Sequence, residues 1–103
     1  MLISFVIPFY NEEKNLFEFL TSLKESIDSF ENYEFEIILI NDSSTDNGRE
    51  LVLDFISNDG RFRLIDNIKN SGQTACFLKG FDMVKGEYTF RIDSDLQDNP
   101  RDL

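Results

Sequence analysis

Two carboxylates stand one residue apart near the end of the chain, at Asp93 and Asp95, and Gln97 follows two positions later. Side-chain oxygens of this kind are the ligands that Mg²⁺ and Mn²⁺ prefer in proteins. The sequence has no His and a single Cys, Cys76, which excludes a Cys-rich zinc site, an internal disulfide framework and a nucleophile activated by His. The spacing therefore indicates a divalent-cation site, with an acidic turn that caps a helix as the alternative.

Other polar side chains directly follow apolar runs, and each has two interpretations. Asp42 either accepts hydrogen bonds from a base or sugar or caps the next helix. Tyr10 either stacks on a planar ring or closes the core, and Glu12 either lines a site or simply favours a helix N-terminus. Residues Asn70–Gln73 either cap a helix or offer free N–H groups to a ligand.

The elements that must position these residues follow from apolar periodicity. Nearly continuous apolar runs are typical of strands buried on both faces, and apolar residues every three or four positions are typical of a helix with one buried face. The predicted strands are Leu2–Ile7, Phe35–Ile40, Phe62–Ile65 and Tyr88–Ile92. The predicted helices are one that begins at a capping Asn11 and buries Leu16, Leu20, Leu23, Ile27 and Phe30, one that carries Leu51, Val52, Phe55 and Ile56, and one over Gln73–Lys85.

The resulting order, β-α-β-α-β-α-β, predicts an α/β fold: a three-layer, Rossmann-like parallel sheet with right-handed crossovers. A strand order of 3-2-1-4 puts the switch point between the first and fourth strands. Ligands of such sheets bind beyond the carboxyl ends of the strands. We therefore expect Tyr10–Glu12 to lie beside Asp93–Asp95.

Length and charge limit the classes of protein. The 103 residues allow one domain. The 20 acidic and 10 basic side chains give a net charge of −10, which argues against nucleic acid as a partner, because phosphate contacts need a basic surface. No apolar run is long enough for a membrane span, and the N-terminus lacks the basic segment of a signal peptide. We expect a cytoplasmic chain.

Five segments, in this order and spacing, resemble glycosyltransferase family 2. The stretch that starts at Asp93 is most similar to the branch that acts on polyprenyl phosphates, which includes dolichol-phosphate mannose synthases and bacterial undecaprenyl-phosphate sugar transferases. The segments are Val6-Ile7-Pro8-Phe9-Tyr10-Asn11-Glu12-Glu13, Ile40-Asn41-Asp42-Ser43-Ser44-Thr45-Asp46, Asn70-Ser71-Gly72-Gln73, Lys85-Gly86-Glu87 and Asp93-Ser94-Asp95-Leu96-Gln97.

The resemblance implies a GT-A fold and a donor sugar linked to UDP or GDP, transferred with inversion at the anomeric carbon. It implies Mg²⁺ or Mn²⁺ on Asp93, Asp95 and Gln97. Two positions depart from the usual pattern: Ser94 stands where Ala is more frequent, and Asn99 where many members have Pro. The implied nucleotide-binding residues are Pro8, Tyr10, Glu12, Ile40, Asp42 and Ser94.

The resemblance also implies what lies outside these residues. The catalytic base and the acceptor half, which would take a polyprenyl phosphate, are expected beyond Leu103, so residues 1–103 resemble the nucleotide-sugar-binding half of a GT-A domain and are expected to be inactive alone. The full-length protein would work at the inner face of the membrane, in cell-envelope synthesis. We further expect self-association through an unpaired fourth strand and a surface that includes Phe77, Phe81 and Tyr88.

Two other classes remain alternatives. A receiver-like domain also gathers acids around Mg²⁺, but its first strand supplies one of them, and here that strand is followed by Pro8-Phe9-Tyr10. A non-catalytic interaction fragment would keep the fold alone. A dinucleotide-binding domain is disfavoured, because no Gly-x-Gly-x-x-Gly follows the first strand.

Overall fold

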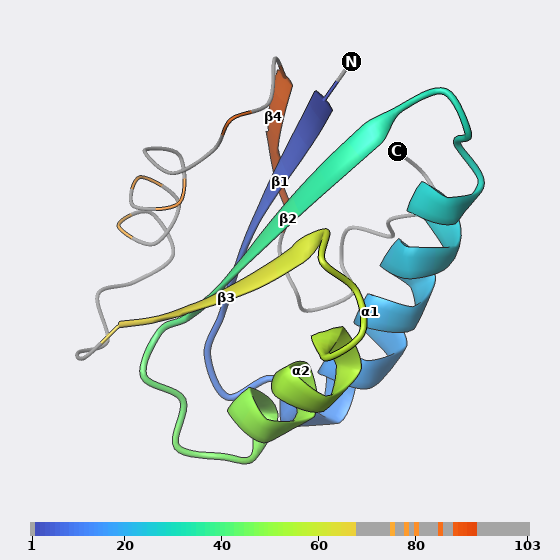
Figure 1. The fold of residues 1–103 in the computed structure, drawn as a ribbon. Coiled ribbons are helices and arrows are strands. Elements are labelled where there is room, and N and C mark those ends of the chain that lie inside the picture. Colours follow the sequence, from blue (N-terminus) through green and yellow to red (C-terminus); the bar gives the residue numbers. More distant parts are fainter. Residues whose placement is uncertain are drawn as a thin grey trace.

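The computed structural model describes residues 2–67, 75, 78, 80, 85 and 88–92. These residues form a parallel sheet with two well-defined helices (Figure 1). Each strand lies within one or two residues of its predicted position. The elements are β1 (Leu2–Phe9), α1 (Glu13–Asp28), β2 (Glu34–Asn41), α2 (Gly48–Ile56), β3 (Phe62–Asp66) and β4 (Tyr88–Arg91).

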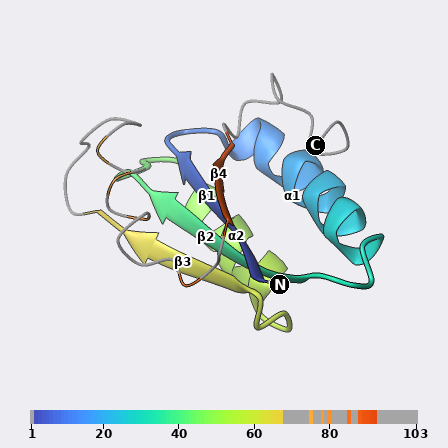
Figure 2. The ribbon, with the colours of Figure 1, turned by 90° about the horizontal axis from the view of Figure 1, so that it is seen from above.

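The strand order is β3-β2-β1-β4, as predicted (Figure 2). All neighbouring strands are parallel, and their registers bring the carboxyl ends together: Phe9 pairs with Asn41, and Asn41 with Asp66. β4 pairs with β1 from Ile3 to Val6. The two central strands are thus the first two of the chain, and the segments that follow them leave from the same edge.

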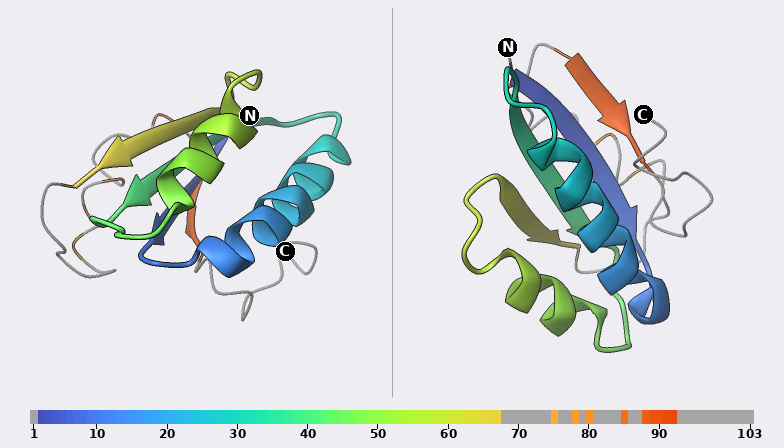
Figure 3. Two further views of the ribbon diagram at one scale, coloured as in Figure 1. Left: turned by 90° about the horizontal axis from the view of Figure 1, so that it is seen from below. Right: turned by 90° about the vertical axis from the view of Figure 1, so that its right-hand side faces the viewer.

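Both helices cover one face of the sheet (Figure 3). The apolar stripe of α1 packs on this face, with Leu16, Leu20 and Leu23 all fully buried. Burial of each such side chain stabilises the fold by about 1.5–3 kcal/mol. On β1 the same core receives Phe5, Ile7 and Phe9, every second residue, as the period of a strand requires.

The opposite face of the sheet carries a second apolar cluster of Val6, Ile38 and Ile40. Gly80 approaches this cluster so closely that a Cβ atom there would lie 2.5 Å from Val6 Cγ1 and 2.8 Å from Ile40 Cδ1. Gly80 is buried and helical. A helical segment therefore packs on this face, which agrees with the predicted third layer. Most of the predicted helix over Gln73–Lys85 lies outside the described residues.

Two sequence-based expectations about α1 are wrong. Phe30 does not join the buried stripe, because α1 ends at Asp28 and the Phe30 side chain is 47% exposed. Asn11 does not cap α1 either; Glu12 occupies that position, with no hydrogen bond from its side chain to the helix backbone. Neither described helix is long and apolar enough to cross a membrane.

An ion cluster ties the C-terminal part of α1 to the turn before β3. Arg61 Nη2 lies 2.7 Å from Asp59 Oδ2 and 2.9 Å from Asp28 Oδ1, and Lys24 Nζ lies 3.1 Å from Asp59 Oδ2. The hydrogen bonds from Arg61 hold the pKa of Asp59 well below its usual range, and the same contact raises the pKa of Arg61. The cluster sits at the amino end of β3, away from the carboxyl edge of the sheet.

Candidate functional site

Polar residues from three strands meet at the carboxyl edge of the sheet. The parallel hydrogen bonding continues just past the strand ends: the Asp42 N–H donates to the Phe9 carbonyl (3.0 Å), and the Asn67 N–H donates to the Asn41 carbonyl (2.8 Å). The residues after β1, β2 and β3 therefore stand side by side, as the strand order predicts.

Asp42 is buried at this edge, with only 3% of the residue exposed. Asn67 Nδ2 donates a hydrogen bond to Asp42 Oδ1 at 3.1 Å, so an amide from the neighbouring strand end holds the carboxylate. The helix-cap interpretation of Asp42 is wrong, because α2 begins six residues later, at Gly48, with Asn47 at its N-cap. The role of Asp42 in recognising a base or sugar stays a prediction.

A second carboxylate of this edge, Asp66, is engaged by a cation and an amide. Arg49 Nε donates to Asp66 Oδ1 and Oδ2 at 3.2 and 3.0 Å, and Asn41 Nδ2 donates to Asp66 Oδ1 at 3.0 Å. The carbonyl oxygen of the Asn41 side chain accepts from the Ser44 N–H at 2.9 Å. Asn41 thereby links the end of β3 to the loop that follows β2.

The candidate residues after β1 differ in exposure. Tyr10 is 45% exposed, so about half of the residue is buried, and its stacking on a planar ring stays a prediction. Glu12 is half-buried, and its carbonyl accepts the N–H groups of Asn15 and Leu16. Pro8 and Ile40 are buried neighbours across the β1–β2 pair, near the ends of both strands.

Asn11 connects the loop after β1 with the loop after β2. Its backbone has a φ of 51°, a left-handed conformation that Gly, Asn and Asp tolerate best. Its Oδ1 accepts hydrogen bonds from the N–H groups of Thr45 (2.8 Å) and Asp46 (3.3 Å), and its own N–H donates to Ser44 Oγ (3.1 Å). The side chain predicted to start α1 thus holds the opposite loop.

Asp46 reaches the N-termini of both helices with one carboxylate. Its Oδ2 accepts from the N–H of Glu13, the first residue of α1, at 3.1 Å, and its Oδ1 accepts from the N–H of Gly48, the first residue of α2, at 2.9 Å. Glu13 Oε1 in turn accepts from the Asn47 N–H at 3.1 Å. The sequence pattern does not indicate this arrangement; its local signal is an Asp two residues before a helix-starting Gly.

The predicted metal-binding residues Asp93, Asp95 and Gln97 lie outside the described residues, as do Ser94 and Asn70–Gln73. Across positions 2–67 and the other described ones, no three His, Cys, Asp or Glu side chains are grouped so as to hold a metal ion. The last described residue, Ile92, is buried, and its N–H donates to the Val6 carbonyl at 3.2 Å. Asp93 follows it directly in the sequence.

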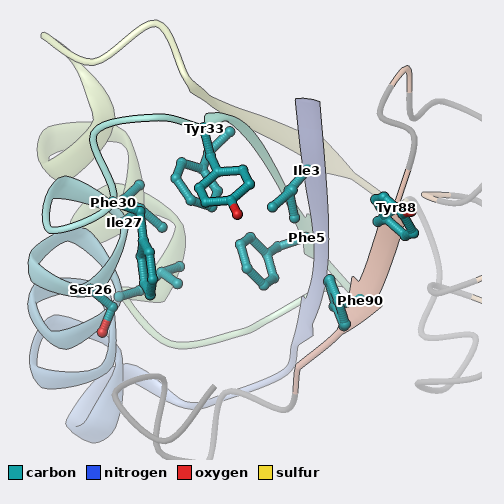
Figure 4. Close-up of a pocket in the computed structure, with 10 residues that line it drawn as sticks. Ile3, Phe5, Ser26, Ile27, Phe30, Tyr33, Tyr88 and Phe90 are labelled. Carbon is teal, nitrogen blue, oxygen red and sulfur yellow. The ribbon is translucent and has the colours of Figure 1, made fainter. Parts of the chain in front are cut away.

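An apolar groove of about 560 Å³ lies elsewhere, between the C-terminal half of α1 and the amino-terminal parts of the strands (Figure 4). Phe5 and Phe35 stack on its floor, with ring centroids 6.0 Å apart. Phe30, Tyr88 and Phe90, which also line it, are each about half exposed. The described residues that line the groove carry no charge.

Known proteins provide an independent comparison. A model of glycosyl transferase family 2 matches residues 4–103. The chain is 37% identical over 103 residues to the undecaprenyl-phosphate 4-deoxy-4-formamido-L-arabinose transferase of Pseudomonas fluorescens (strain SBW25), a match that covers 98% of this chain and 30% of that protein. It is 38% identical over 98 residues to the uncharacterized glycosyltransferase YkcC of Bacillus subtilis (strain 168), with 94% and 30% covered. The chain thus spans about 30% of the length of these curated relatives.

Solved structures agree on the fold. TarS residues 1–349 of S. aureus, in complex with UDP-GlcNAc, superpose with a TM-score of 0.82 at 30% identity, over 92% of this chain and 27% of that one. The mannosyltransferase PcManGT from Pyrobaculum calidifontis, in complex with GDP-Man and Mn²⁺, gives 0.80 at 20% identity, over 90% and 27%. Since the family model extends over almost the whole chain and the observed sheet is that of these glycosyltransferases, the chain belongs to glycosyl transferase family 2.

Proposed function

We propose that this chain is the donor-binding half of the GT-A domain of a glycosyltransferase that takes a UDP- or GDP-linked sugar. The observation that carries the proposal is the meeting of Tyr10, Glu12 and buried Asp42 at the carboxyl edge of a parallel sheet. The relatives support it: the TarS and PcManGT complexes hold UDP-GlcNAc and GDP-Man. A receiver-like domain is less well supported, because Tyr10, rather than an acid, directly follows β1.

The nucleoside would lie across the ends of β1 and β2. Asp42, fixed by Asn67, accepts a hydrogen bond from the ring N–H that both uracil and guanine present. The exposed Tyr10 ring stacks on the base or ribose, and the Glu12 carboxylate accepts from ribose hydroxyls. Pro8 and Ile40 form the apolar wall beneath the base.

The diphosphate would lie beyond β4. Asp93, Asp95 and Gln97 offer side-chain oxygens as metal ligands. Such a set suits Mg²⁺ or Mn²⁺ when phosphate oxygens complete the coordination. When bound, such a cation supplies Lewis-acid stabilisation of the leaving nucleoside diphosphate. Ser94, between the two carboxylates, lies against the nucleotide. This chain's own part in the reaction is therefore to bind and orient the leaving group.

We expect the acceptor site and the catalytic base to lie outside residues 1–103. Relatives named undecaprenyl-phosphate transferases support a polyprenyl phosphate as acceptor. The inner face of the membrane, as the place where the full-length protein works, stays an expectation. Because the chain spans about 30% of such a relative, we expect residues 1–103 to bind the donor without transferring its sugar.

Calorimetric titration with UDP and GDP, with and without Mn²⁺, tests the proposal. We expect Mn²⁺-dependent binding of one nucleotide. Asp42→Ala should weaken that binding by about tenfold or more and leave the affinity for inorganic diphosphate nearly unchanged, because Asp42 contacts only the base. Asp95→Asn should weaken the binding of both ligands. If neither nucleotide binds, or if Asp42→Ala lowers only the melting temperature, the assignment of the site is wrong.

Self-association of the isolated chain is a separate part of the proposal, with a second copy as the occupant of the apolar groove. β4 is the outer strand of the sheet within the described part of the chain, and an open strand edge is a template for pairing. Tyr88 and Phe90 stand on this strand, 55% and 47% exposed, and both line the groove. A symmetric contact would bury the same edge and groove of each copy.

A further inference from the structure

The proposed nucleoside-binding residues stand on two different loops, and one hydrogen-bonded unit joins those loops. Tyr10 and Glu12 flank Asn11 in the loop after β1, whereas Asp42 opens the loop after β2. We call the joining unit the loop clasp: Asn11 and Glu13 on one side, Ser44–Gly48 on the other, with hydrogen bonds of 2.8–3.3 Å between the two sides.

The Asp46 carboxylate is well suited to hold both sides. The first N–H groups of a helix have no partner within the helix, and the N-terminus carries a partial positive charge. Asp46 satisfies one such N–H in each helix and places its negative charge at both N-termini. An amide in its place keeps only one oxygen acceptor, so Asp46→Asn loses the hydrogen bond to the N-terminus of one of the two helices. Gly48 leaves room for this contact, because a Cβ atom there would lie 3.0 Å from Asp46 Oδ1.

Asn11 combines two properties that few residues share. It adopts a positive φ, and its side-chain oxygen accepts from the Thr45 and Asp46 N–H groups. Glycine would adopt the same backbone conformation without supplying the acceptor. Aspartate supplies the acceptor and tolerates the conformation. Asn11→Gly and Asn11→Asp therefore separate the hydrogen bonds from the backbone requirement.

We propose that Asn11 and Asp46 are positioning residues, which touch no part of the nucleotide and set the distance between Tyr10 and Glu12 on one side and Asp42 on the other. The inference rests on the proposed donor-nucleotide site. Loosening the clasp lets the two halves of the nucleoside pocket move apart, so affinity for the nucleoside part falls. The diphosphate contacts, which the proposed function assigns to residues after β4, would stay intact.

The test compares Asp46→Asn, Asn11→Gly and Asn11→Asp with a matched control, Asp59→Asn. Asp59 is also a carboxylate with several partners, but it lies in the ion cluster before β3, away from the carboxyl edge. For each variant we would measure the Kd of the nucleotide and of inorganic diphosphate in the presence of Mn²⁺, the thermal stability, and amide hydrogen exchange without ligand.

We expect Asp46→Asn and Asn11→Gly to weaken nucleotide binding by about tenfold, to leave diphosphate binding within about twofold, and to accelerate exchange at the Glu13, Thr45 or Gly48 amides. Asn11→Asp should retain most of the affinity. Asp59→Asn should lower stability with the nucleotide Kd unchanged. Unchanged nucleotide affinity in Asp46→Asn and Asn11→Gly would overturn this inference but not the proposed function. An equal loss of nucleotide affinity in Asp59→Asn would do the same. Failure of the unaltered chain to bind nucleotide would instead overturn the proposed function, and this inference with it.

Discussion

Gly80 is a residue whose type is required by its neighbours rather than by its own backbone. A Cβ atom there would lie 2.5 Å from Val6 Cγ1, and Val6 is fully buried in a central strand. A β-branched side chain in a strand with neighbours on both sides has little freedom to move away. The absence of a side chain at this position therefore allows a helical segment to pack closely on the sheet.

We predict that Gly80→Ala destabilises the protein by about 1–3 kcal/mol, the usual cost of overpacking a buried site. Alanine favours a helix over glycine by about 1 kcal/mol, but the clash outweighs this gain. Gly60→Ala is the matched control, because nothing lies within 4 Å of a Cβ atom there, and its effect should stay below about 1 kcal/mol. Urea denaturation measures both. A Gly80→Ala protein as stable as the parent would contradict the close approach.

At the scale of elements, the ion cluster of Lys24, Asp28, Asp59 and Arg61 joins α1 to the turn before β3. Asp59 is its centre, with hydrogen bonds from Arg61 that hold its pKa low in the folded state. Arg61 stays protonated at every working pH, since the same contact raises its pKa. Within the cluster, Asp59 is therefore the carboxylate whose lowered pKa links stability to pH.

This arrangement predicts how stability depends on pH. The folded pKa of Asp59 is below its unfolded value, which is about 3.9, so its contribution is complete above that value and disappears as the pH falls through the folded pKa. We expect the free energy of unfolding to fall below about pH 4, and to fall less steeply in Asp59→Asn, which is less stable at neutral pH. Asp54→Asn, at an exposed carboxylate of α2, is the control. If the free energy of unfolding falls equally steeply below pH ~4 in the parent and in Asp59→Asn, Asp59 is not the source of the acid dependence.

At the scale of the whole molecule, two features oppose each other. The edge of β4, the outer strand within the described part of the chain, and the groove beside it would favour association, whereas the net charge of −10 opposes it. Repulsion between like charges is screened over a Debye length of about 10 Å at 0.1 M salt. Salt therefore weakens the charge repulsion between two copies more than it weakens the apolar attraction between them.

We predict that light scattering shows a shift from monomer to dimer as salt and protein concentration rise. Phe90→Lys should prevent dimer formation at all salt concentrations, because it places a charge in the apolar groove. Leu53→Lys makes the same change on α2, at an exposed position outside the groove, and should leave dimer formation intact. A parent chain that stays monomeric throughout, or an equal effect of the two lysine variants, would show that this surface does not pair.

The sequence alone determined the class of fold and the edge at which the candidate residues meet. Short apolar runs that alternate with helical stripes allow few arrangements other than a parallel α/β sheet, and such a sheet gathers its strand ends at one edge. The strand order 3-2-1-4 was expected from these patterns, and the structure confirms it.

Tertiary structure alone decided which side chains pair within that edge. Asn11 before two glutamates has the pattern of a helix cap, yet its acceptor serves Thr45 and Asp46, 34 and 35 residues away. Asp42 has the pattern of a cap as well, but it is buried against Asn67. A short polar side chain bonds with whichever backbone group lies within reach, and in a crossover fold that group belongs to a neighbouring loop distant in sequence, so local patterns do not specify it.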